Sequence, residues 1–96
     1  MAKYIALINW TEAGIKDVKA SPDRADKARA LAKKLGGDMQ QIFMTMGTYD
    51  LVAILEMPDD EAMAKFALAS AVGGHIRTTT LKAFDEASYR KIVGSV

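Results

Sequence analysis

The chain has 96 residues, half of them hydrophobic and 26% charged, with a formal net charge of +1 and no cysteine. This length fits one domain spanning 1–96, and the composition excludes a disordered or fibrous chain. The absence of cysteine excludes disulfides and thiolate metal sites, and the near-neutral charge disfavours a dedicated nucleic-acid-binding protein. A domain of this size buries only roughly 60–65% of its unfolded surface, so the high apolar content suggests self-association.

The first half of the chain predicts a strand, a helix and a second strand. The apolar run Lys3–Trp10 is typical of a strand, because it is too short for a helix. Ser21 and Pro22 predict the start of a helix, with serine as N-cap and proline in the first helical position. Small and apolar residues then recur at three- and four-residue steps up to a glycine pair, and we expect Arg24 to lie outside that stripe. Residues 39–46 predict the second strand.

The second half repeats the same order. Tyr49–Met57 predicts a third strand, joined to the second by a tight turn at a glycine. The acids in Pro58–Glu61 are typical of a helix N-terminus, where carboxylates cap free amides, and they do not resemble a metal site. His75–Phe84 is rich in β-branched residues and predicts a fourth strand, and Glu86–Val93 predicts a short terminal helix.

The β-α-β, β-α-β order predicts an α+β, ferredoxin-like fold, with a four-stranded antiparallel sheet and both helices on one face. The strands are apolar on both faces. In the first, Tyr4, Ala6, Ile8 and Trp10 oppose Ile5 and Leu7; in the second, Ile42, Met44 and Met46 oppose Phe43; in the third, Leu51, Ala53, Leu55 and Met57 oppose Val52 and Ile54. Since the helices cover one face, we expect a second subunit to cover the other, sheet against sheet.

The charges and apolar runs predict a cytoplasmic protein that binds neither membrane nor nucleic acid. No run approaches the ~18–20 apolar residues of a membrane span, and the first strand is too short for a signal-peptide core. Seven basic and three acidic residues lie between Lys16 and Lys34, a pattern typical of a solvated helix face, with an anion-binding patch as the alternative. An RNA recognition motif has the same strand order, but the third strand has aliphatic residues where its stacking aromatics belong.

Several segments together resemble a known family. Gly47–Val52, Pro58–Glu61 and Ile76–Phe84 resemble the GYD-domain family of small bacterial proteins, and Thr11–Ile15 and Ser21–Arg24 are also similar to it. The resemblance covers nearly the whole chain. It implies a dimeric α/β barrel, in which ferredoxin-like units pack sheet against sheet. It implies no activity, because the family is largely uncharacterised.

Tyr49 and Asp50 follow the hairpin glycine and are the first candidate ligand-binding residues. In the functional interpretation the phenol donates to a ligand and the carboxylate orients it or acts as a base. In the structural interpretation Asp50 accepts amide protons of the turn, and Tyr49 packs on the sheet. The spacing alone does not choose between them.

His75, Arg77 and Thr79 alternate along the fourth strand and are expected on one face. They could bind a carboxylate or phosphate, with Arg77 as the anchor and His75 as a titratable partner. The alternative is an edge strand protected by charge and threonine. A single histidine without cysteine predicts no metal site, and no motif predicts a cofactor. The chain departs from the GYD family at two positions, because that family often has Asn in place of His75 and Tyr in place of Phe43. The resemblance therefore does not support a role for the His75 imidazole.

Trp10, the only tryptophan, closes the first strand and is expected in the core, at an interface or at the edge of a pocket. The main hypothesis is a homo-oligomeric small-molecule-binding or regulatory domain, with an apolar pocket edged by Trp10, Tyr49, Asp50, His75 and Arg77. The alternative is a cofactor-independent enzyme, an isomerase, decarboxylase or monooxygenase with His75 or Asp50 as base, acting on a small anionic or aromatic substrate. A purely structural assembly module is a third hypothesis.

Overall fold

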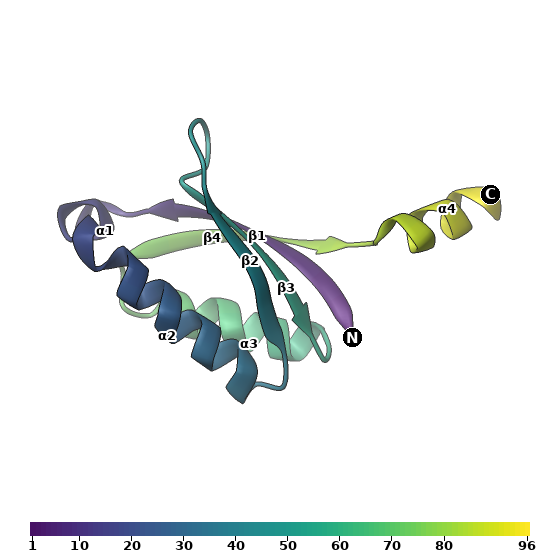
Figure 1. The fold of residues 1–96 in the computed structure, drawn as a ribbon, viewed down its shortest axis with the longest axis horizontal. Helices are drawn as coiled ribbons and strands as arrows, with labels where there is room; N and C mark the ends of the chain where they lie inside the picture. Colours follow the sequence, from purple (N-terminus) through teal and green to yellow (C-terminus); the bar gives the residue numbers. More distant parts are fainter.

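The apolar runs of the sequence form four strands that pair into one antiparallel sheet (Figure 1). The computed structural model describes residues 1–96. Its elements are β1 (Ala2–Trp10), α1 (Glu12–Lys16), a 3₁₀ turn (Val18–Ala20), α2 (Ser21–Lys34), β2 (Asp38–Met44), β3 (Leu51–Met57), α3 (Asp60–Ala71), β4 (Ile76–Ala83) and α4 (Glu86–Gly94).

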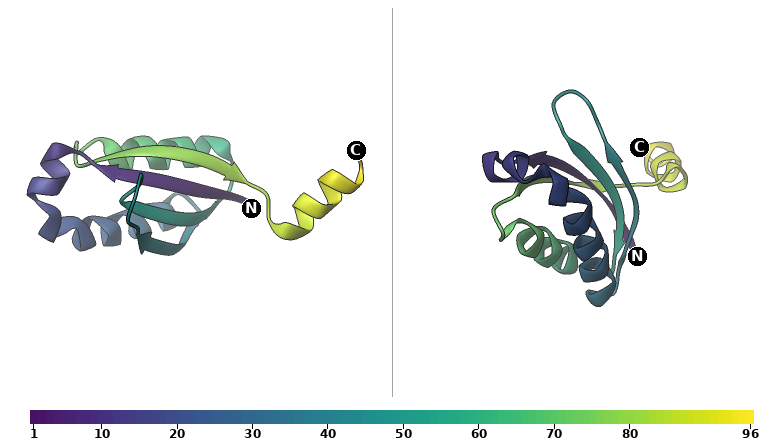
Figure 2. Two further views of the ribbon diagram at one scale, coloured as in Figure 1. Left: turned by 90° about the horizontal axis from the view of Figure 1, so that it is seen from above. Right: turned by 60° about the vertical axis from the view of Figure 1, so that its left-hand side comes forward.

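The strand order β2-β3-β1-β4 places β1 and β3 at the centre of the sheet and β4 at an edge. All three pairings are antiparallel. Helices α2 and α3 cover one face of the sheet, and α4 extends away from the body of the domain (Figures 1 and 2). The ferredoxin-like α+β fold expected from the element order is therefore confirmed.

The core lies between the sheet and the helices α2 and α3. Alternate residues of β1 and β3 point into it, because side chains along a strand point to opposite faces. The buried apolar residues are Tyr4, Ala6, Ile8, Ala32, Met39, Ala53, Leu55, Met57, Met63 and Phe66. The first and third strands thus bury the larger of the two apolar sets that the sequence contains.

The smaller apolar set lies on the opposite side of the sheet, which we call the open face. Leu7 pairs with Val52 and Thr79, and Ile5 pairs with Ile54 and Leu81, so these residues form two rows across three strands. Phe43 of β2 extends the first row, since it pairs with Val52. No element of this chain covers the rows, and the Phe43 side chain is 50% exposed. The open face of a single subunit thus has uncovered apolar rows at its centre, with the ion pair of Lys3 and Glu56 beyond one row and Asn9 and Arg77 beyond the other.

The connection from β1 to α2 corrects the expected helix start. The short helix α1 follows β1 directly, with Thr11 as its N-cap, because the Thr11 hydroxyl accepts the amide proton of Gly14 at 3.1 Å. Ser21 is not an N-cap, because the 3₁₀ turn already leads into α2 and Ala20 occupies the cap position. The Ser21 hydroxyl instead accepts the indole proton of Trp10 at 3.2 Å. A tertiary contact therefore replaces the expected local one.

The β2–β3 hairpin is longer than the sequence predicted, because β2 ends at Met44 and β3 begins at Leu51. Toward its tip, side-chain hydrogen bonds add to or replace the regular ladder of backbone hydrogen bonds. The Thr45 hydroxyl donates to the Tyr49 carbonyl, and the Asn9 amide group donates to the Thr48 carbonyl at 2.8 Å. The Asn9 contact ties the hairpin to the end of β1.

The acids before α3 have separate roles. Asp59 is the N-cap and accepts the amide proton of Ala62 at 2.8 Å, as expected. Asp60 accepts the hydroxyl proton of buried Tyr4 and pairs with Lys82 at 3.0 Å. Burial and the nearby Asp60 raise the pKa of Tyr4 to about 12, and the hydrogen bonds from Tyr4 and Lys82 lower the pKa of Asp60. This contact ties β1, α3 and β4 together.

Asp85 is the N-cap of helix α4, and its carboxylate accepts the amide proton of Ser88 at 2.8 Å. Every residue of α4 is exposed, including the apolar side chains of Tyr89, Ile92 and Val93. No helix of the chain is long and apolar enough to cross a membrane.

Candidate functional site

A pocket of about 320 Å³ lies between the sheet and the two helices α2 and α3. It opens because the helices contact each other little and both rest mainly on the sheet. Of its 23 lining residues, 15 are hydrophobic. The apolar lining includes Ala6, Ile8, Ala28, Leu31, Met39, Ile42, Leu51, Ala53, Met63, Phe66 and Ala67.

The polar lining comes from α2, the end of α3, the loop after it and β4. It consists of Ser21, Arg24, Lys27, Ser70, His75, Thr78 and Thr80. No aspartate or glutamate lines the pocket. An apolar cavity with a few convergent polar groups is the usual form of a small-molecule site.

Two polar atoms at this pocket have no partner. Arg24 Nη2 and Ser70 Oγ are both buried and make no hydrogen bond. A buried polar atom left without a partner costs about 1–3 kcal/mol, more if it is charged, and such atoms are rare in folded proteins. Both residues line the same pocket, so the side chains in its wall include two polar atoms without a partner.

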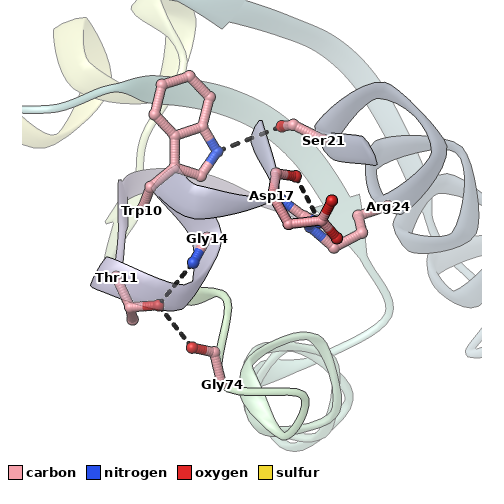
Figure 3. A network of polar contacts seen from close by, with 7 residues as sticks. All are labelled: Trp10, Thr11, Gly14, Asp17, Ser21, Arg24 and Gly74. Carbon is pink, nitrogen blue, oxygen red and sulfur yellow. Dashed lines mark hydrogen bonds and ion pairs between the residues drawn. The ribbon is translucent and has the colours of Figure 1, made fainter. Parts of the chain in front are cut away.

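Asp17 holds the Arg24 side chain in place. Arg24 Nη1 donates to the Asp17 carbonyl at 3.2 Å and pairs with the Asp17 carboxylate at 3.5 Å, as Figure 3 shows. The Arg24 side chain is 23% exposed, and the Asp17 side chain is 64% exposed. The guanidinium is therefore fixed on one edge by the chain before α2, and its other edge stays unpaired.

Contacts of Thr11 join the start of α1 to the loop after α3 (Figure 3). The Thr11 hydroxyl donates to the Gly74 carbonyl at 2.6 Å, and the Thr11 amide donates to the His75 carbonyl at 3.0 Å. A Cβ on Gly14 would lie 2.0 Å from the His75 carbonyl oxygen, so only glycine fits there. This close approach places the backbone of His75 beside α1.

Trp10 and Asp50, two of the residues predicted to edge a pocket, lie together at the end of β1. The Asp50 carboxylate accepts the backbone amide proton of Trp10 at 3.0 Å, and the Asp50 amide donates to the Ile8 carbonyl at 2.9 Å. The structural interpretation expected Asp50 to accept amide protons of its own turn, whereas its carboxylate accepts the amide proton of Trp10 in β1. Tyr49 lies in the hairpin beside it, and none of Trp10, Tyr49 and Asp50 lines the pocket.

His75 and Arg77 are separated, although the sequence placed them on one face. His75 lies in the loop before β4 and lines the pocket, as do Thr78 and Thr80. Arg77 pairs with Asn9 in the register of the sheet and does not line the pocket. The alternation starts only at Ile76, because Gly74, at a φ of 80°, turns the chain just before it. Of the five predicted site residues, the pocket includes His75 alone.

The sequence did not predict Arg24 and Ser70 as pocket residues, although their spacing along the helices indicates that both face inward. Arg24 lies four residues before Ala28 and seven before Leu31, so it continues the apolar stripe of α2 instead of lying outside it. Ser70 lies four residues after Phe66 and seven after Met63, on the apolar stripe of α3. A polar residue in register with a core stripe is a sign of a polar group facing inward.

Three solved structures share this fold at low sequence identity. They are the Thermus thermophilus protein TTHA0845 (TM-score 0.56, 22% identity, 88% of this chain and 94% of that chain), the Mycobacterium tuberculosis leucine response regulatory protein LrpA (0.58, 12%, 88% and 51%) and an ACT domain protein from Streptococcus pneumoniae (0.51, 14%, 86% and 90%). No curated protein matches the sequence. The model of the GYD domain matches residues 4–93, in agreement with the resemblance carried by the turn before β3 and by β4. The chain belongs to the GYD domain family.

Proposed function

We propose that the protein is a homodimeric small-molecule-binding domain, which pairs through its open face and binds its ligand in the pocket beneath α2 and α3. The observation that carries this proposal is the pocket itself. Its volume of about 320 Å³ and its mainly apolar lining agree with small-molecule sites, which run from roughly 300 to 1,000 Å³. A core packed only for stability has few voids larger than a water molecule.

The apolar open face supports pairing with a second copy. Four strands lie about 4.8 Å apart, and each has about seven residues with a rise of about 3.3 Å per residue. They make a face of roughly 450 Å², without the additional surface of the protruding side chains. A stable dimer buries about 800 Å² per partner. The open face supplies a large part of that area, and the exposed apolar side chains of α4 supply more. Pairing of two such faces removes the same apolar rows from water in both subunits.

A regulatory role is the version of this function that the fold neighbours suggest. The Mycobacterium tuberculosis neighbour is named a leucine response regulatory protein, and another neighbour is an ACT domain protein. In the proposed dimer the pocket and the interface lie on opposite faces of the same four strands. A ligand that moves α2 and α3 on the sheet would therefore change the face that pairs with the partner.

Two measurements on the full chain test this function. Sedimentation at low micromolar concentration should give a dimer, and a thermal-shift screen with small carboxylates, phosphates and aromatic compounds should find ligands that raise the melting temperature. A folded monomer at that concentration would contradict the dimer. A screen without any stabilising compound would contradict the binding role.

A further inference from the structure

We infer that the pocket binds an apolar molecule with a single carboxylate, whose charged end pairs with Arg24 and Ser70. This inference rests on the proposed function, because it names the ligand class of the same pocket. It is carried by the cationic and unpartnered polar groups among the residues that line the cavity, and by the apolar side chains that make up most of the lining.

The apolar lining selects the body of the ligand. Side chains from both layers close around it, Leu31 and Phe66 from the helices and Leu51 from the sheet. None of these can donate or accept a hydrogen bond, so a polar body would lose its contacts with water without replacement. An alkyl or aromatic body is favoured there.

Arg24 selects the charge of the head group. A guanidinium presents parallel N–H donors that fit the two oxygens of a carboxylate, and Asp17 occupies Nη1 only. Nη2 is buried and unpaired, and Ser70 Oγ provides a further hydroxyl that can donate to the same group. These donors are sufficient for one carboxylate.

The charges around the pocket disfavour a positively charged head group on the ligand, and they also disfavour a dianion. Arg24 and Lys27 line the pocket and no acid does, so an ammonium group bound there would face two cations and no carboxylate in the lining. The Asp17 carboxylate beside Arg24 offsets part of its charge, which favours a singly charged head group over a phosphate dianion.

The test compares three ligands with the same body and different head groups: hexanoate, 1-hexanol and hexylamine. Each is titrated into the full chain, and binding is followed by chemical-shift changes of the backbone amides in the NMR spectrum. Hexanoate should bind best and hexylamine worst. Hexanoate should bind at least about tenfold more tightly than hexanol, since a hydrogen-bonded charge pair contributes that much or more.

Variants locate the head group. Arg24→Met keeps an apolar stem and should weaken hexanoate at least about tenfold, to the level of hexanol, without changing hexanol binding. Arg24→Lys keeps the charge without the planar fork and should fall between. Ser70→Ala should weaken hexanoate by a smaller factor. The matched control is Arg29→Met on the same helix, because Arg29 pairs with Asp26 at 3.7 Å and does not line the pocket.

A fourth variant locates the body. Ala67→Leu adds a branched side chain to the pocket wall and should weaken hexanoate and hexanol equally, which also excludes binding to the open face as the source of the signal. Dispersed amide spectra show that each variant is folded.

The outcomes separate this inference from the proposed function. Equal binding of hexanoate and hexanol, both lost in Ala67→Leu, would overturn the carboxylate while leaving a small-molecule pocket in place. Equal weakening of hexanoate by Arg24→Met and Arg29→Met would also overturn the carboxylate. Binding of none of the three ligands would overturn the inference, and with no stabilising compound in the thermal-shift screen the binding function would fail as well.

Discussion

The two faces of the sheet are built from the same kinds of residues but reach different states in the structure. On the covered face, Tyr4 is 3% exposed and Leu55 is fully buried, because α2 and α3 lie over them. On the open face, Phe43 is 50% exposed and Leu81 is 45% exposed. Only one of the two faces is covered by elements of this chain, so the proposed dimer depends on a second copy to cover the other.

The largest predicted effect is on the free energy of unfolding, and it compares substitutions of two neighbouring residues on opposite faces of the sheet. Leu55→Ala removes a fully buried side chain and should lower the free energy of unfolding by about 2–5 kcal/mol, because it leaves a cavity in the core. Ile54→Ala, one residue away on the open face, should cost less than about 1 kcal/mol in a dilute monomer. Urea unfolding at low protein concentration measures both. Equal losses would mean that the open face is already covered within one subunit.

The next largest predicted effect is on dimerisation through the open face. Leu7→Lys places a charge in the centre of the open face, between Val52 and Thr79, and should weaken dimerisation about a hundredfold or more, since an unpaired charge would be buried in the interface. Sedimentation equilibrium over a range of concentrations measures the change. Leu68→Lys is the control, because Leu68 is 75% exposed on α3 and lies away from the open face. A similar loss in both variants would argue against an interface on the sheet.

A third prediction concerns the contact of Tyr4 with Asp60 beneath the covered face. The pKa of the Asp60 carboxyl is below its usual 3.8, so its stabilisation is fully present above that pH and is lost as the pH falls through the lowered value. The pKa of Tyr4 is raised to about 12, so the stabilisation from its neutral phenol is present below pH 10 and is lost as the pH rises from 10 to 12.

Tyr4→Phe removes the hydroxyl from this contact. The variant should lose less stability than Leu55→Ala at neutral pH, and its unfolding free energy should vary less with pH at both ends. Thermal melts from pH 3 to pH 11 measure the profile. A variant with the same profile as the unmodified chain would show that Asp60 depends on Lys82 alone, so Lys82→Met is the companion measurement.

The fold was predictable from the sequence because it depends on local patterns. A short apolar run placed β1, alternation showed that β1 and β3 are apolar on both faces, and the glycine pairs and acids placed ends of α2 and α3. Ser21 shows where such reasoning fails: its serine-proline pattern is typical of an N-cap, but the hydroxyl accepts a proton from Trp10, eleven residues away. A local pattern carries no information about that contact.

The site was less predictable, because it depends on which face each helix turns toward the sheet. The charge of Arg24 favours the solvated side, although its spacing from Ala28 and Leu31 places it on the inner stripe. Alternation places His75 on the face of Arg77, although the turn at Gly74 ends that alternation. For both residues, residue type or strand period predicts one face, and the backbone geometry places the residue on the other.

The smallest predicted effect concerns α4, which belongs to neither face of the sheet in a single subunit. Ile92 is 46% exposed on this helix, so Ile92→Ser should leave the unfolding free energy of a dilute monomer unchanged within about 0.5 kcal/mol. If α4 adds to the dimer interface, the same variant should weaken association several-fold in sedimentation, far less than Leu7→Lys. Lys91→Ser, one residue earlier on the helix, is the control. Unchanged association in both would limit the interface to the sheet, and the rows through Ile5 and Leu7 would then account for all of its apolar area.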